Sequence, residues 1–227
     1  HRVMVEAEAG YFINKTQRYK VEPSHKLRGY GFSNAILSVR YGLYSNPFQR
    51  LFMSSSLGLK APFSTEYQEV DGVVLTEDVQ PTLGVFGLVI QTYIVKEDSF
   101  RSLRFFATNR IELNRPNRYD FHLGTSVFTS LYLSRHLVNE FLGGDWTTIL
   151  QLRNEVRTKN KMEGKPIDSS GGVMFFLSPQ INYNFAEAWN LSVMTDIPVY
   201  QYLNGVQLGT KFGVTVSLAW DVGIVQD

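Results

Sequence analysis

Apolar residues recur at every second position through most of this chain, and this alternation constrains the fold more than any other feature. Between Trp189 and Val199, positions 189, 191, 193, 197 and 199 are apolar, while Asn190, Ser192 and Asp196 lie between them. Successive side chains of an extended strand point to opposite faces. A period of two therefore predicts strands that each have one apolar and one polar face.

Ten segments of the chain show this pattern, and no helical periodicity competes with them except over residues 134–144, where one helical turn is an alternative. The expected strands are 2–13, 29–44, 48–61, 81–96, 100–113, 119–134, 145–158, 173–185, 189–202 and 206–220. No repeat or linker divides them. We therefore expect residues 1–227 to form a single all-β domain.

The connections between these strands differ in length on the two sides. Short turns are expected at 45–47, 97–99 and 186–188, and longer polar loops at 14–28, 63–79 and 160–172. Short turns at one end and long loops at the other are typical of outer-membrane barrels. The sequence thus predicts an antiparallel up-and-down transmembrane β-barrel of about ten strands, twelve being possible. An even number of strands would leave both termini on the periplasmic side.

Composition excludes several classes of function. Cysteine is absent, which excludes disulfides and thiolate-based metal sites or nucleophiles. The net charge is +1, so no basic excess indicates nucleic acid. No apolar run reaches the roughly 18 residues of a transmembrane helix.

Three observations favour an apolar face that points outward, toward lipid. The polar face carries small groups in mid-strand, such as Ser54, Ser56 and Gly58, where a water-exposed surface would carry more Lys and Glu. The apolar row of the segment 119–134 is long enough for a tilted membrane strand. All three tryptophans, Trp146, Trp189 and Trp220, fall at the short-turn end, where they are predicted to anchor the membrane interface. A soluble barrel or sandwich remains the alternative.

With apolar residues outside, the opposite parity lines the lumen. The candidate pore-lining residues are Arg104, Arg110, Glu112, Asp120, His122, Arg153, Glu155, Arg157, Asp196 and Lys211. Basic groups slightly outnumber acidic ones on this face, which predicts a pore with a mild preference for anions. The alternative is a network of cross-strand pairs, Glu112 with Asp120 and Arg110 with His122, that closes a narrow lumen.

Enzymatic chemistry has little support in the sequence. His122, Asp120 and Ser126 share one strand face, where successive side chains are about 7 Å apart and too distant for a direct Ser–His contact. No metal-ligand spacing or nucleotide fingerprint occurs. We therefore expect no enzyme, no metal and no cofactor.

Two segments are irregular. The expected strand 81–96 is apolar on both faces, which indicates packing against an inner element or a partner protein. Pro198 lies inside an expected strand but has no N–H for a ladder, and so predicts a bulge near the rim.

Three stretches resemble a known family. They are LSVRYGLYSNPFQRLFMSSSLGLKAPF (37–63), GGVMFFLSPQINYNF (171–185) and IPVYQYLNGVQLGTKFGVTVSLAW (197–220). They are similar to the family of phenol-degradation meta-pathway proteins, which are channel-like, transporter-type barrels of the bacterial outer membrane. The resemblance runs from about Arg40 to Trp220. It implies passage of small organic molecules and supplies no catalytic residues.

Together these features predict a passive, porin-like channel for small solutes in a bacterial outer membrane. The expected surroundings are outer-membrane lipid and lipopolysaccharide, without nucleic acid. The alternative is a non-conducting barrel that anchors a larger envelope complex through its loops or through the segment 81–96.

Overall fold

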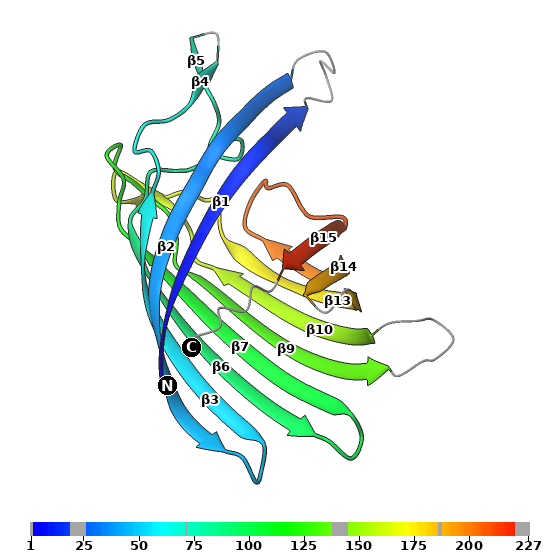
Figure 1. Cartoon of the computed structure of the whole chain (residues 1–227). Helices are drawn as coiled ribbons and strands as arrows, with labels where there is room; N and C mark the ends of the chain where they lie inside the picture. Colours follow the sequence, from blue (N-terminus) through cyan, green and yellow to red (C-terminus); the bar gives the residue numbers. More distant parts are fainter. Residues whose placement is uncertain (1, 19–25, 71, 138–144, 186–187, 221–227) are drawn as a thin grey trace.

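Ten strands pair into one curled antiparallel sheet in the computed structural model of the chain (Figure 1). The structure describes residues 2–18, 26–70, 72–137, 145–185 and 188–220. The strands of the large sheet are β1 (Val3–Arg18), β2 (Lys26–Asn46), β3 (Leu51–Pro62), β6 (Gly87–Asp98), β7 (Leu103–Asn114), β9 (Ser126–Leu137), β10 (Asp145–Arg157), β13 (Gly172–Phe185), β14 (Trp189–Leu203) and β15 (Gly213–Trp220). Each pairs with its neighbours in chain order, which confirms the expected up-and-down arrangement.

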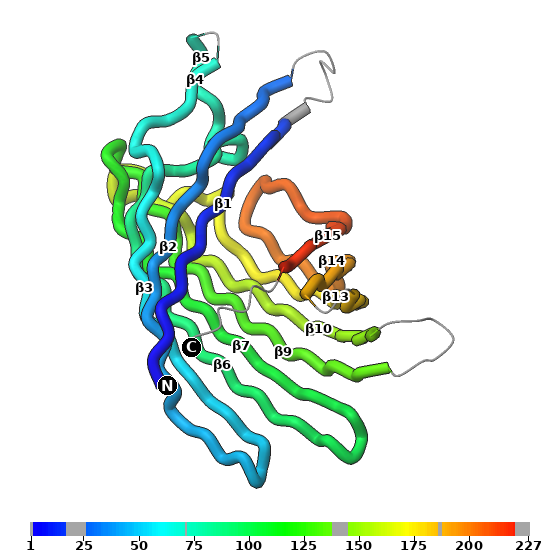
Figure 2. Tube along the Cα trace, in the orientation of Figure 1, coloured from blue at the N-terminus to red at the C-terminus, as the bar shows by residue number. Residues whose placement is uncertain are grey.

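The sheet curls into a half-barrel. Among the described residues, β1 and β15 are its two edges and pair with no further strand. Val3 pairs with Tyr41 and Trp220 with Trp189, so β1 begins and β15 ends at the end that carries the short turns. The opposite end carries the long loops (Figure 2).

The β1/β2 hairpin extends past the rest of the sheet. β3 pairs with β2 only from Asn34 onward, while the preceding residues of β2 pair with β1 alone. The loop after β3 contains the short strands β4 (Glu69–Val70) and β5 (Val73–Val74). It lies against this extension, where the side chain of Gln68 accepts a hydrogen bond from Tyr30 N at 3.1 Å.

The expected strand 119–134 is wrong in its first half. The chain turns at Asp120, whose φ is 54°, and the side chain of Asn117 accepts hydrogen bonds from the backbone of Tyr119 and Phe121. β8 (Phe121–His122) then joins β11 (Lys161–Met162) and β12 (Lys165–Pro166) in a separate small sheet. Phe121 is fully buried there and is not part of an outward apolar row.

The bulge expected at Pro198 is confirmed. Phe175 pairs with Tyr200 but Phe176 pairs with Pro198, so β14 has one extra residue at this point. A bulge reverses which face the following side chains occupy. β15 pairs with β14 only up to Asp196 opposite Gly213, just before the bulge, so the expected strand 206–220 is shortened.

The two apolar faces of the segment 81–96 also have an explanation. Its first residues belong to the loop, and β6 begins only at Gly87. Val85 and Val89 are each 1% exposed and pack inside the molecule, whereas Leu88 and Ile90 point outward. The alternative helical turn fails over 134–137, which belong to β9, and its remainder lies outside the described residues.

Candidate functional site

The concave face of the sheet is polar and crowded, and the convex face is apolar and exposed. Cross-strand partners share a face, and the ladder Ser56, Gln91, Arg110, Phe128, Glu155 therefore follows the inner side. The buried small or amide side chains of this side are Ser38, Ser56, Gln91, Ser126, Ser130, Ser134, Gln151 and Ser178. The outer side exposes Leu37, Leu57, Leu59, Leu131, Leu150, Leu152, Ile181, Val193, Val214, Val216 and Leu218.

A first cluster of charges crosses the concave face from β1 to β7. Lys60 Nζ is 3.0 Å from Glu112 Oε2, and Arg110 Nε is 2.8 Å from Glu112 Oε1. Arg110 Nη1 also lies 3.1 Å from Glu8 Oε2. Lys60 is only 4% exposed, so this cluster is deeply placed.

The contact between Glu8 and Arg110 is possible only because the sheet is strongly curled. Four strand-to-strand steps separate β1 from β7 in the sheet. At about 4.8 Å per step, a flat sheet would place these strands roughly 19 Å apart. Curling brings the two side chains together, and their ion pair connects β1 to β7 across the concave face.

A second cluster joins β10 to β14. Arg153 contacts Glu155 at 3.1 Å and Asp196 at 3.2 Å, and Arg157 Nη2 lies 3.2 Å from Glu155 Oε2. The hydroxyl of Ser178 donates a hydrogen bond to Asp196.

Aromatic rings lie beneath the arginines of the concave face. The guanidinium of Arg40 is 3.7 Å from the ring centre of Tyr93, and that of Arg153 is 4.5 Å from Phe176. Cations placed over ring faces are stabilised by the ring quadrupole. This aromatic lining was not predicted from the sequence, although Tyr93 and Phe176 occupy the same strand faces as the polar residues.

The ion pairs of the concave face contain equal numbers of cations and anions, while the expected anion preference stays a prediction. Arg40 pairs with Glu6 at 2.8 Å, separately from the two clusters. Away from the short-turn end, the five paired cations are Arg40, Lys60, Arg110, Arg153 and Arg157, and the five paired anions are Glu6, Glu8, Glu112, Glu155 and Asp196. Because these groups are paired, the face offers a fixed, net-neutral network.

Seven of the ten predicted lumen residues lie on this face: Arg104, Arg110, Glu112, Arg153, Glu155, Arg157 and Asp196. Arg104 lies at the short-turn end of the face, where it is more than half exposed and pairs with Glu97 at 2.6 Å. Lys211 lies between β14 and β15, outside any strand.

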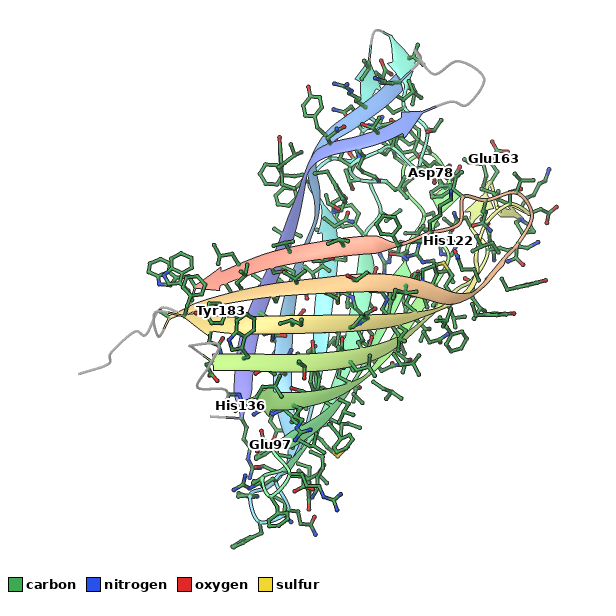
Figure 3. The ribbon with its side chains drawn as sticks, turned by 90° about the vertical axis from the view of Figure 1, so that its right-hand side faces the viewer. Asp78, Glu97, His122, His136, Glu163 and Tyr183 are labelled. Carbon is green, nitrogen blue, oxygen red and sulfur yellow. The ribbon has the colours of Figure 1, made fainter. Side chains whose placement is uncertain are left out.

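Asp120 and His122 lie among the long loops. The expected pairs Glu112–Asp120 and Arg110–His122 are wrong, because the ladder resumes only at Ser126, which stands opposite Glu112. Figure 3 shows His122 and Asp78 at the long-loop end, whereas Tyr183, His136 and Glu97 lie toward the opposite end. His122 Nε2 is 2.8 Å from the carbonyl oxygen of Asn114.

The long loops pack into a cap with its own buried core. Gln80 is 2% exposed, and its side chain donates to the carbonyls of Gln68 and Leu75 and accepts from Gln68 N. The amide of Asn117 donates to the carbonyl of Leu83 and to the hydroxyl of Tyr67. Burial raises the pKa of the Tyr67 phenol, which stacks on Tyr119 at 4.5 Å.

Between the cap and the concave face lies a cavity of about 1250 Å³. Its sheet wall includes Glu112, Phe128, Arg153, Glu155, Arg157, Met174, Phe176 and Asp196, and its loop wall includes Glu77 and Asp78. A smaller space of about 390 Å³ lies among the loops beside Asp120, His122 and Lys161.

The tryptophans form part of one aromatic row at the short-turn end. Trp146 stacks on Tyr183 at 4.4 Å, and Trp189 stacks on Trp220 at 5.7 Å. Phe185 joins the two halves, at 5.7 Å from Tyr183 and 6.5 Å from Trp189. The structure thus places the three residues at one level on the outer face, while their role as interface anchors stays a prediction.

In the part of the chain that the structure describes, no cluster of His, Asp or Glu could hold a metal ion. The same residues contain no helix that is long and apolar enough to cross a membrane. No protein-family model matches the chain, and no curated protein matches it either. The resemblance noted in the sequence therefore stays a prediction.

Proposed function

We propose that this chain is an outer-membrane β-barrel and acts as a passive pore for small solutes. The observation that carries the proposal is the inversion of the two faces. Large aliphatic side chains are about half exposed over the whole convex face, while the concave face holds paired charges and small polar groups. Lipid as the outer solvent accounts for this inversion, because bacterial barrels are apolar outside and polar inside.

The proposal requires the half-barrel to close. Open sheet edges do not occur in the hydrocarbon region, because unpaired backbone groups there have no water to bind. β1 starts and β15 ends at the same end of the sheet, so the two edge strands run in opposite directions. They are therefore oriented to pair directly with each other in the antiparallel sense.

The proposed solute path follows the cavity under the cap and the concave face below it. Since the paired network is net neutral, we expect little selection between small inorganic cations and anions. Water-filled polar lumens of this kind need no catalytic group, metal or cofactor. The resemblance to channel-like barrels of phenol degradation agrees with passage of small organic molecules.

Conductance of the purified, folded protein in a planar lipid bilayer tests this function. We expect discrete steps with weak ion selectivity. A barrel that migrates as a heat-modifiable species on a gel but stays silent in the bilayer would exclude the pore. Solubility of the folded protein without detergent would exclude the membrane barrel itself.

One observation favours a second candidate, a non-conducting barrel that anchors an envelope complex. The ion pair of Glu8 and Arg110 crosses four strand-to-strand steps and, together with buried Lys60, fills part of the concave face. A fixed network of this kind would close a narrow lumen. Partner proteins would then bind the long-loop cap, and the silent bilayer described above is the result that this candidate predicts.

A further inference from the structure

Arg157 differs from the other cations of the concave network. Its side chain is 51% exposed, whereas those of Arg40, Lys60, Arg110 and Arg153 range from 4% to 26%. Its contacts among the described residues are one to Glu155 Oε2 at 3.2 Å and one to the ring of Phe128 at 5.7 Å. A guanidinium has five N–H donors, so most of those of Arg157 are still available.

The space beside this guanidinium is open because its neighbours on both strands are small. Arg157 stands opposite Ser126 on β9 and opposite Gly172 on β13. All three residues line the cavity of about 1250 Å³. The sheet therefore presents the charged end of Arg157 to an open space and does not bury it against a large side chain.

An apolar wall of the same cavity lies next to Arg157. Phe128, Met174 and Phe176 belong to the inner face of β9 and β13 and line the cavity. Phe176 is 3% exposed and Arg153 covers its ring, so Phe128 and Met174 supply the accessible apolar surface of this wall.

The acidic groups of the sheet wall all have cationic partners. Glu112 is held by Lys60 and Arg110, and Glu155 and Asp196 are held by Arg153. On the loop wall, Glu77 and Asp78 face the cavity together with Lys15, whose amino group donates to the carbonyl of Gln80 at 2.8 Å. The spare donors of Arg157 are thus the most exposed cationic donors of the sheet wall.

We propose that this cavity binds small amphipathic organic acids, with Arg157 holding the carboxylate and Phe128 and Met174 contacting the apolar body. The planar fork of an arginine matches a carboxylate through two parallel hydrogen bonds. Ligand pockets commonly combine such a polar anchor with an apolar wall. This inference deepens the proposed pore by naming the class of solute that the site takes.

Titration calorimetry on the protein in lipid nanodiscs tests the proposal, with empty nanodiscs as the blank. The probes are hexanoate, 1-hexanol and hexylamine, which share one apolar chain and differ in the head group. We expect hexanoate to bind most tightly. Arg157→Gln should weaken hexanoate binding about ten-fold or more, because a charged hydrogen-bond pair is lost, and should leave 1-hexanol unchanged.

Two matched variants control this result. Arg104→Gln removes a cation that pairs with Glu97 at the short-turn end, and it should not change the affinity for hexanoate. Arg157→Lys keeps the charge but loses the fork, and it should retain part of the affinity. Glu155 keeps Arg153 as a partner in every Arg157 variant, so the fold should survive, which heat-modifiable gel migration checks.

Tighter binding of hexylamine than of hexanoate, an unchanged affinity in Arg157→Gln, or no binding of any probe would each overturn the site. The assay does not depend on conductance. A protein that binds hexanoate through Arg157 but is silent in the bilayer would keep this inference and remove the pore. A protein that conducts but does not bind hexanoate would keep the pore and remove the proposed binding site.

Discussion

The buried pair of Lys60 and Glu112 supports a quantitative prediction, because its two members are not equally dependent on each other. Among the described residues, Lys60 has one ionic partner, Glu112, and is 4% exposed. Glu112 has two cationic partners, Lys60 and Arg110. Removing the carboxylate therefore leaves a buried cation unpaired, whereas removing the lysine leaves the carboxylate bound to Arg110.

The free energies of unfolding should follow this asymmetry. Glu112→Met should destabilise the protein by about 3–5 kcal/mol, the usual cost of an unpaired buried charge. Lys60→Met should cost only about 1–2 kcal/mol, because one charge-assisted contact is lost and no buried charge is left without a partner. The double variant should be more stable than Glu112→Met alone, since it removes the stranded ammonium and Arg110 keeps Glu8.

Urea unfolding in lipid vesicles, followed by tryptophan fluorescence, measures these differences. Lys159→Met is the control, because Lys159 pairs with Asp168 on an exposed loop and such pairs contribute little. A larger loss of unfolding free energy in Lys60→Met than in Glu112→Met would refute this asymmetry. A double variant that is less stable than both single variants would refute it as well.

Three further predictions concern the outer face and the cap. Leu152 is 43% exposed and stands between Leu131 and Leu177 on the outer face. In vesicles, Leu152→Arg should lower the free energy of unfolding by about 2–4 kcal/mol, because a charge would enter the lipid-facing surface. A loss below about 0.5 kcal/mol would exclude such a surface. Brominated lipids should quench Trp189 and Trp220 most strongly when the bromine lies near the interface, and strongest quenching from the chain ends would contradict an anchoring role. Burial, reinforced by the charge of Asp78, raises the pKa of Glu77 above its ordinary 4.5, so ionising this carboxyl opposes folding as pH rises through the raised pKa. Glu77→Gln should therefore stabilise the protein by less than about 1 kcal/mol at pH 7 and have no effect below pH 4.5. The exposed substitution Glu163→Gln is the control. A Glu77→Gln variant that is less stable than the original protein at pH 7 would contradict the expected direction.

Most of the large sheet could be predicted from local pattern. Each of the ten strands overlaps the segment in which the alternation placed it, although β6, β9 and β15 begin later than expected. The period of two identifies both a strand and its two faces. The bulge at Pro198 also followed from the sequence, since proline has no N–H to give to a ladder. Counting alternate positions from the turns also predicts the common level of the three tryptophans, Trp146, Trp189 and Trp220.

Errors arose where loop chemistry interrupted the ladder. A side chain that satisfies two backbone N–H groups, as Asn117 does, can end a strand without any change in the apolar pattern. The cross-strand pairs of Glu112 and Arg110 were therefore misassigned, and Asp120 and His122 were placed on the sheet. The loop cap was missed altogether, because its buried core depends on contacts such as those of Gln80 that have no period.

The sequence by itself determined that the chain forms strands, in which order they pair, and which residues share a face, because these properties depend on the alternation and on short connections. The tertiary structure alone decided how strongly the sheet curls. That curl brings Glu8 of β1 to Arg110 of β7 across four strand steps, and it shapes the cavity that Arg157 lines. Curvature sums small twists over many strands, and no single residue encodes it.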